Sequence, residues 1–384
     1  MGKLTREALT LDRSRKGGME VHMEKVLKIG IIGCGGIANS KHMPSLSKLE
    51  GVLLTAFCDI EIGKAETAAK KYGADGAQVF SDYKELLKLS DIDVVHVCTP
   101  NLTHSDITVD ALEAGKHVMC EKPMAVTAVE AKRMLDAAKR TGKKLTIGYQ
   151  NRCRPDSIYM KEEAKKGAFG EIYYAKATAL RRRAVPTWGV FQDDKWKSGP
   201  LFDIGTHALD LSLWMMDNYR PKYCVGTMYH KLNRDTDQGN IWGDWDPEKY
   251  TAEDSAFGFV VMENGATVTL EASWALNILD AREAITTVCG TKAGADMRDG
   301  LRINGICNNR QYITKPGLDG GDIAFIKAFP EEKPADREAR LWIDAIRNGT
   351  DPVTLPEQAY CVTRILEGIR ISAETGAPYF FPED

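Results

Sequence analysis

A lysine in one part of the sequence and an aspartate-histidine pair in another could carry out chemistry. Lys122 lies in the run Glu121-Lys122-Pro123, directly after a short apolar stretch. A lysine held by a following proline at the mouth of a cleft could have a lowered pKa and exchange a proton with a substrate hydroxyl. Asp203 and His207 are four residues apart, so on a helix they share a face, and the carboxylate can orient and polarise the imidazole as a general base. Together the three side chains predict proton transfer at a hydroxyl group.

The same residues also have ordinary structural interpretations. Lys122 could be a surface lysine paired with Glu121, and Asp203 could be a helix N-cap with His207 one turn further on the helix face. Asp210, which follows His207 by one more turn, is expected to be structural. These residues alone leave both interpretations open.

A glycine-rich turn follows the first apolar stretch and precedes a helical pattern. It comprises Gly33, Gly35, Gly36, Ile37 and Ala38, with Cys34 between the first two glycines. The first glycine permits a tight turn, the second lets the backbone approach a pyrophosphate, and the small alanine lets helix and strand pack closely. A glycine turn without a nucleotide is the alternative. The position between strand and helix favours a dinucleotide site.

Asp59 ends the second apolar stretch, about 20 residues beyond the turn, where a carboxylate accepts hydrogen bonds from the ribose hydroxyls of a dinucleotide. The same carboxylate would repel a 2'-phosphate, and no arginine follows it. Lys64 in the next helical pattern could soften this preference. We therefore expect NAD rather than NADP.

Short apolar runs alternate with helical patterns up to Tyr149, and the runs are rich in Val, Ile and Leu on both faces. Predicted strands cover 26–33, 52–59, 94–100, 117–121 and 144–149, and predicted helices cover 39–48, 62–72, 83–89, 103–114 and 128–141. This alternation predicts a doubly wound parallel α/β sheet. Ligands bind at the carboxyl edge of such sheets. Residues that follow predicted strands there, and so face the nicotinamide, are Thr99, Pro100, Asn101, His104, Glu121 and Lys122.

Beyond Asn151 the strands become longer and alternate in polarity. They are predicted at 171–180, 255–276 with a turn at 263–265, and 283–290, with helices at 156–166, 201–216, 335–347 and 356–374. An Asn-Gly pair between alternating runs favours an antiparallel hairpin. We therefore expect a flexible arm over 1–24, a dinucleotide-binding domain over 25–150, and an α+β domain with a large, mostly antiparallel open sheet over 151–384. A free sheet face would suit a homo-oligomer, a dimer or larger.

In order and spacing, the motifs together resemble the Gfo/Idh/MocA oxidoreductase family over residues 25–381. The matching stretches read GCGGIA, TPNLTH, AGKHVMCEKP, GYQNRCRP and PLFDIGTHALDLSLW. The resemblance implies that Lys122, Asp203 and His207 occupy the family's catalytic positions. It also implies that Gln150 and Asn151 lie where nicotinamide and substrate meet, with Asn151 on the cofactor side and Gln150 on the substrate side. Substrates of the family are mostly sugars, inositols, glycosides and sugar nucleotides.

Tryptophans and arginines of the second part add expectations about the substrate. The tryptophans of interest are Trp188, Trp196, Trp242, Trp245 and Trp274, several of them in polar segments. An indole can stack on a sugar face or an aromatic aglycone; anchoring of loops or interfaces is the alternative. Arg152 and the run 181–183 could bind an acidic substrate, or could be a solvated cluster. The stretch RRRAVPTWGVF resembles members that act on glycosides, including those that oxidise the C3 hydroxyl of the sugar.

The composition limits the classes of partner that the chain is expected to bind. The chain has 384 residues and a formal net charge of -3, which gives no electrostatic footprint for nucleic acid or an anionic membrane. Nine scattered cysteines without Cys-x-x-Cys spacing predict reduced thiols, a cytoplasmic protein and no structural metal. No apolar run reaches membrane-spanning length. The expected function is NAD-dependent oxidation of a carbohydrate.

Two alternatives use the same motifs. An NAD-dependent glycosidase would oxidise C3 transiently, eliminate the aglycone and reduce the sugar again, with no net NADH. A regulatory NAD-binding protein would turn nothing over, but it would not need Lys122, Asp203 and His207 together.

Overall fold

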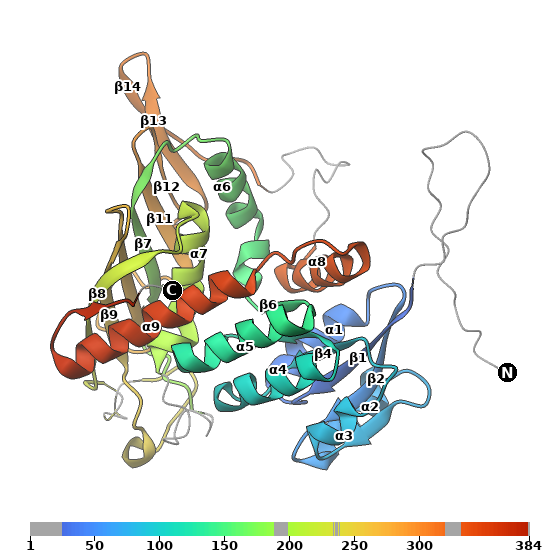
Figure 1. Cartoon of the computed structure of the whole chain (residues 1–384). Helices are drawn as coiled ribbons and strands as arrows, with labels where there is room; N and C mark the ends of the chain where they lie inside the picture. The colour runs from blue at the N-terminus through green and yellow to red at the C-terminus, as the bar shows by residue number, and fades with distance from the viewer. Residues whose placement is uncertain are drawn as a thin grey trace, which may run out of the picture.

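Two β-sheets organise the chain (Figure 1). The computed structural model describes residues 25–187, 199–232, 234, 237, 239–318 and 332–382. The arm predicted over 1–24 lies outside the described residues.

The first sheet has six parallel strands in the order β3-β2-β1-β4-β5-β6. The strands are β1 (Leu27–Ile32), β2 (Val52–Cys58), β3 (Gln78–Phe80), β4 (Val94–Val97), β5 (His117–Cys120) and β6 (Leu145–Ile147). Five of them were predicted from their apolar runs. Strand β3 has only three residues, all at least partly exposed, so no apolar run marks it. The order reverses between β1 and β4, which opens a crevice at their carboxyl ends.

Helices cover both faces of this sheet (Figure 1). They are η1 (Ala38–His42), α1 (Met43–Leu46), α2 (Ile62–Tyr72), α3 (Tyr83–Leu87), η2 (Asn101–Thr103), α4 (His104–Glu113) and α5 (Ala128–Thr141). The bounds of α2 and α5 are those predicted, and α5 begins at a capping box of Thr127 and Glu130. The helix predicted over 39–48 is divided into η1 and α1, with Pro44 in the first turn of α1.

The second sheet has nine strands in the order β14-β13-β12-β11-β7-β10-β9-β8-β15. They are β7 (Ile172–Leu180), β8 (Pro221–Tyr229), β9 (Ser255–Met262), β10 (Thr267–Ser273), β11 (Ile285–Gly290), β12 (Gly294–Asp296), β13 (Arg302–Cys307), β14 (Arg310–Thr314) and β15 (Tyr379–Phe380). The hairpin of β9 and β10 is confirmed. Strands β7 and β10 pair in parallel, unlike the others, because helical segments and two strands lie between them in the chain.

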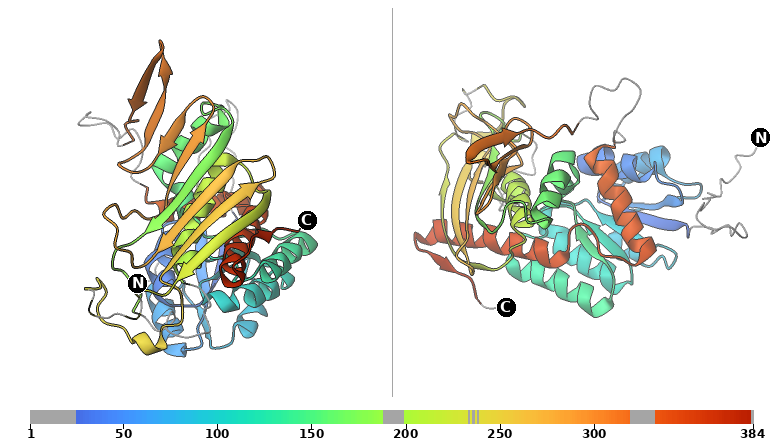
Figure 2. Two further views of the ribbon diagram at one scale, coloured as in Figure 1. Left: turned by 90° about the vertical axis from the view of Figure 1, so that its left-hand side faces the viewer. Right: turned by 90° about the horizontal axis from the view of Figure 1, so that it is seen from above.

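Helices α7 (Thr206–Met216) and α9 (Pro356–Thr375) pack on one face of this sheet. The other helical segments described after residue 149 are η3 (Gln150–Cys153), α6 (Pro155–Lys165), η6 (Leu201–Gly205), η7 (Pro247–Lys249) and α8 (Pro334–Asn348). Ile369 of α9 packs so closely on Gly226 and Gly258 that a Cβ at either glycine would lie within 2.4 Å of it. Among the described residues, no helix lies in front of the other face of the sheet (Figure 2, left).

Helix α8 packs against the first sheet. Although it comes from the C-terminal part, its Ala339, Trp342 and Ile343 are buried in the same core as β1 and β2. The C-terminal part therefore contributes one wall around the first sheet, beside the crevice. The domain boundary expected between residues 150 and 151 stays a prediction.

Candidate active site

The glycine turn has the geometry of a dinucleotide cradle. Gly33 has φ +88°, and a Cβ there would lie 2.7 Å from the carbonyl carbon and oxygen of Cys98, so only glycine fits. A Cβ at Gly35 or Gly36 would meet nothing within 4 Å, so this backbone stands open to a ligand. Ala38 is fully buried where η1 begins, while Ile37 is 39% exposed. The turn therefore fits a pyrophosphate.

Asp59 lies beside this cradle at the end of β2. Its Oδ2 accepts from the backbone N of Cys34 at 2.9 Å, and its Oδ1 accepts from the backbone N of Glu61 at 2.9 Å. A hollow of about 640 Å³ opens next to it, large enough for an adenosine. Lys64 at its rim is paired with Glu61 at 2.6 Å, which reduces its availability for a 2'-phosphate.

The turns after β4 and β5 are tied together by His104. Its Nδ1 lies 2.8 Å from the carbonyl oxygen of Pro123, and its Nε2 lies 2.8 Å from that of Thr99. Thr99, Pro100 and Asn101 are partly or fully exposed at the crevice edge, as expected. His104 is fully buried and therefore holds the turns together instead of reaching a cofactor, which corrects the prediction.

Glu121 also differs from the prediction of a cofactor contact. It is 4% exposed, and both of its oxygens accept hydrogen bonds from protein groups. Lys41 and His42 donate to Oε1, and the backbone N of Lys122 donates to Oε2. The sequence prediction missed Lys41 and His42. The sequence signal for them was that two polar residues lie in the first predicted helix, which should pack against the sheet.

Lys122 from the first sheet meets Asp203 from the second part of the chain. Its Nζ donates to the Asp203 carbonyl oxygen and to Oδ1, each at 2.9 Å. The fully buried Trp274, at the end of β10, donates from its indole N–H to Oδ2 of Asp203 at 3.1 Å. Burial would raise the pKa of Asp203, but Lys122 and Arg181 hold it below its usual value. Asp203 is therefore an anion with a fixed orientation.

His207 is near this pair but is not oriented by it. Its Nδ1 is buried without a hydrogen-bond partner among the described residues, while Asp203 binds Lys122 and Trp274. The predicted orientation of the imidazole by Asp203 is thus wrong for this structure, because the carboxylate binds Lys122 and Trp274 and not His207. Burial and the charge of Lys122 lower the pKa of His207 to about 3. The ring is neutral at neutral pH and can accept a proton.

Residues of η3 have divided roles. Gln150 and Asn151 begin η3, shortly after β6, and are partly exposed; their contacts with nicotinamide and substrate stay a prediction. Arg152 is 1% exposed and donates to Asp210 at 2.9 and 2.6 Å, as well as to Gln358 and to the carbonyl oxygen of Val353. A buried pair of this kind satisfies its charges internally. Arg152 is therefore structural, not a substrate ligand, and the structural role expected of Asp210 is confirmed.

The tryptophans differ in exposure. Trp188 and Trp196 lie outside the described residues. Trp274 is fully buried and Trp245 is 7% exposed, so neither offers a face to a sugar, whereas Trp242 is 38% exposed. The guanidinium of Arg181 lies 5.0 Å from the Trp242 ring and is paired with Glu283 at 2.6 Å.

Comparisons with known proteins agree with this geometry. A family model described as the oxidoreductase family with an NAD-binding Rossmann fold matches residues 27–149, and the GFO/IDH/MocA C-terminal domain matches residues 158–296. A D-glucoside 3-dehydrogenase of Escherichia coli (strain K12) is 35% identical over 91% of this chain and 96% of its own length. An inositol 2-dehydrogenase of Salmonella typhimurium (strain LT2) is 32% identical, over 50% of this chain and 55% of its own length.

Among solved structures, a levoglucosan dehydrogenase in complex with NADH and levoglucosan has a TM-score of 0.77. The match is at 22% identity and covers 93% of this chain and all of that one, which shows a shared fold. The first model covers the first sheet and Lys122, and the second covers most of the second sheet and Asp203. The chain therefore belongs to the Gfo/Idh/MocA family of NAD-binding oxidoreductases.

Proposed function

We propose that the chain oxidises a secondary hydroxyl of a glycoside, at C3 of the sugar ring, with NAD as the hydride acceptor. The observation that carries the proposal is the contact between Lys122 and Asp203 across the two sheets, beside the open glycine cradle and a neutral His207. The name of the E. coli relative, which matches over nearly its whole length, supports the position C3. The names of the shorter matches support the wider class of sugars and cyclic polyols.

Each side chain has a distinct part in the proposed reaction. An ammonium has three hydrogens, and Lys122 uses two contacts on Asp203, which leaves one N–H for the substrate oxygen. That N–H stabilises negative charge as the hydroxyl ionises. The neutral imidazole of His207 takes the hydroxyl proton. When bound, NAD supplies the acceptor for the hydride of the same carbon.

The aglycone is proposed to stack on Trp242. Its ring is exposed and held in place by Arg181, whose positive charge also acts on Asp203. Contacts remote from the reacting carbon can orient it, so an aromatic aglycone should raise kcat/KM.

The test is incubation of the protein and NAD with a panel of aryl glucosides, free hexoses and myo-inositol, with the new carbonyl located by NMR. A 3-keto glycoside, formed with net NADH and a higher kcat/KM than for free glucose, is the expected product. A higher value for myo-inositol than for every glycoside would contradict the glycoside assignment and leave the polyol class. Release of aglycone without net NADH would favour the glycosidase alternative.

We also propose that the chain forms a homo-oligomer through the open face of the second sheet. Val225, Tyr229 and Phe259 alternate with Gly226 and Gly258, which contact α9, so they lie on the open face, and each is at least 40% accessible to solvent. Gathered apolar residues on one face are typical of an interface. Light scattering would report the mass, and a charged residue at Phe259 should reduce it.

A cytoplasmic location is proposed from the thiols. All nine cysteines are free, and seven are buried, which suits a reducing compartment. None of the helices in the described part of the chain has the length and apolar character needed to cross a membrane.

A further inference from the structure

A buried group of polar side chains lies beneath the Lys122 turn, and the proposed reaction does not use it. It comes from four separate elements and is called the Lys41 cluster. Its members are Lys41 and His42 of η1, His96 of β4, Glu121 directly after β5, and Glu338 of α8, none more than 8% exposed. Charged groups so far from solvent require partners.

Glu121 is the centre of the Lys41 cluster. Its Oε1 accepts from Lys41 Nζ at 2.7 Å and from His42 Nε2 at 2.8 Å, and its Oε2 accepts from the backbone N of Lys122 at 3.0 Å. Burial alone would raise the pKa of Glu121, but Lys41 and His42 hold it well below its usual value. The carboxylate is therefore a permanent anion that joins η1 to the backbone of Lys122.

Lys41 extends the connection to two further elements. Its Nζ lies 2.8 Å from Oε2 of Glu338 on α8 and donates to Oε1 of Gln150 at 3.4 Å. Burial would lower the pKa of Lys41, but the two carboxylates raise it above its usual value. One ammonium thus links η1, the Lys122 turn, η3 and α8.

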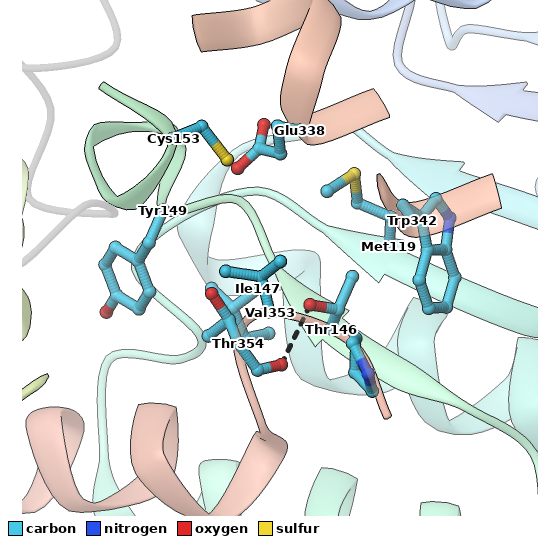
Figure 3. Close-up of a pocket in the computed structure, with 10 residues that line it drawn as sticks. Met119, Thr146, Ile147, Tyr149, Cys153, Glu338, Trp342, Val353 and Thr354 are labelled. Atoms are coloured by element: carbon cyan, nitrogen blue, oxygen red, sulfur yellow. Dashed lines mark hydrogen bonds between the residues drawn. The ribbon is translucent and has the colours of Figure 1, made fainter. Parts of the chain in front are cut away.

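Helix α8 packs against the Lys41 cluster through Glu338, which pairs with Lys41. Figure 3 shows Glu338 and Trp342 projecting from α8 beside Cys153 and Met119. The cavity that remains between them is about 10 Å³, room for one water molecule at most. Little solvent can therefore screen the charges of Lys41 and Glu121.

The two histidines extend the cluster to β4. His42 donates from Nε2 to Glu121, because the carboxylate only accepts, and its Nδ1 shares a hydrogen bond with Nδ1 of His96 at 3.0 Å. Nε2 of His96 is buried without a partner among the described residues. Burial and nearby positive charge hold the pKa of His96 well below its usual value. The pair therefore links Glu121 to β4 through hydrogen bonds.

We propose that Lys41 and Glu121 are positioning residues that set the place of Lys122 relative to the glycine turn. The inference rests on the role proposed above for Lys122. Helix η1 begins at the glycine turn, so the chain from Lys41 and His42 through Glu121 ties the backbone of Lys122 to the cofactor cradle. A displacement of a catalytic group by about 1 Å can cost about a hundredfold in rate.

The experiment is a double-mutant cycle with NADH formation from an aryl glucoside, or from the best substrate of the panel above. Lys41→Met and Glu121→Asp are each made in the wild-type chain and in a Lys122→Met chain. In the wild-type chain each should lower kcat by about tenfold, and in the Lys122→Met chain by less than about twofold, because a positioning residue acts only through its target. The loss of Tm should be equal in both chains.

Two controls separate position from stability. Lys41→Arg keeps the charge and can bridge both carboxylates, so it should retain kcat within about threefold. Lys48→Met removes a different link to α8, the pair of Lys48 with Asp336 at 2.7 Å, without touching Glu121. It should leave kcat unchanged.

The outcomes are distinguishable. Equal losses of kcat in both chains would show a merely structural role and overturn the inference, as would an unchanged kcat in Lys41→Met. If Lys41→Met does not fold, the Glu121→Asp arm decides in the same way. Near-normal turnover of Lys122→Met itself would instead contradict the proposed function, and the inference with it.

Discussion

The cofactor end and the chemical end of the site are built differently. The cofactor end is local, since the glycine turn and Asp59 follow neighbouring strands β1 and β2, and Asp59 binds the backbone of Cys34 directly. The chemical end joins Lys122 of the first sheet to Asp203 and Trp274 of the second. A local site can be recognised from spacing in the chain, whereas the assembled one depends on how two sheets meet. The two ends should therefore also respond separately to mutation.

The largest expected effect separates turnover from cofactor binding. Lys122→Met or His207→Ala should lower kcat by about a hundredfold or more, the scale of a lost general acid or base. Because neither side chain contributes to the glycine cradle, the NAD dissociation constant should change by less than about threefold. Steady-state kinetics and calorimetric NAD titration measure the two quantities. Near-normal turnover of both variants would place the chemistry elsewhere.

Trp274→Phe tests the next effect, at the chemical end. The change removes the N–H that orients Asp203 while keeping a buried aromatic ring. Loss of a hydrogen bond to a charged group costs about 1.5–3 kcal/mol, so kcat should fall by about ten- to a hundredfold. Tyr250→Phe is the matched control, because Tyr250 packs on Trp274 edge to face with ring centroids 6.1 Å apart and its hydroxyl has no partner among the described residues. Equal effects of the two variants would indicate loss of packing alone.

Asp59 tests the cofactor end. Asp59→Ala should weaken NAD by about tenfold and NADP much less, since only NAD gains the ribose hydrogen bonds. Asp59→Asn is the companion variant, because an amide oxygen can still accept from one backbone N–H of the turn. NADP binding to the unmodified protein as tight as NAD binding would refute the assignment. Turnover at saturating NAD should stay close to normal in both variants.

The sequence predicts elements marked by local patterns better than contacts between distant segments. Five strands of the first sheet follow from continuous apolar runs, which need no partner to be recognised. Strands β13 and β14 were not predicted because their residues are largely exposed and only their pairing marks them. Arg152 was misjudged because its partner Asp210 lies 58 residues away. The Lys41–Glu338 contact joins still more distant segments, and nothing in the spacing of either residue indicates it.

The smallest effect is on stability. His207 has a pKa of about 3 in the folded chain against 6.5 in an ordinary environment, so between these values the unfolded chain binds more protons and stability falls as pH falls. His207→Gln should reduce that fall by up to about 1.4 kcal/mol per pH unit. Urea unfolding measures it at about pH 7, above both pKa values, and at about pH 6 and about pH 5, between them. The exposed His230 provides the control, His230→Gln. The same slope in both variants would contradict a buried neutral His207.

The central claim is that hydride leaves C3 of a glycoside in a site assembled from both sheets. An aryl glucoside deuterated only at C3, incubated with the protein and NAD, tests it most directly, because the label follows the hydride. The account predicts deuterium at C4 of the reduced nicotinamide and loss of this transfer in Lys122→Met. Reduced nicotinamide without deuterium, with the label retained in the sugar, would contradict it.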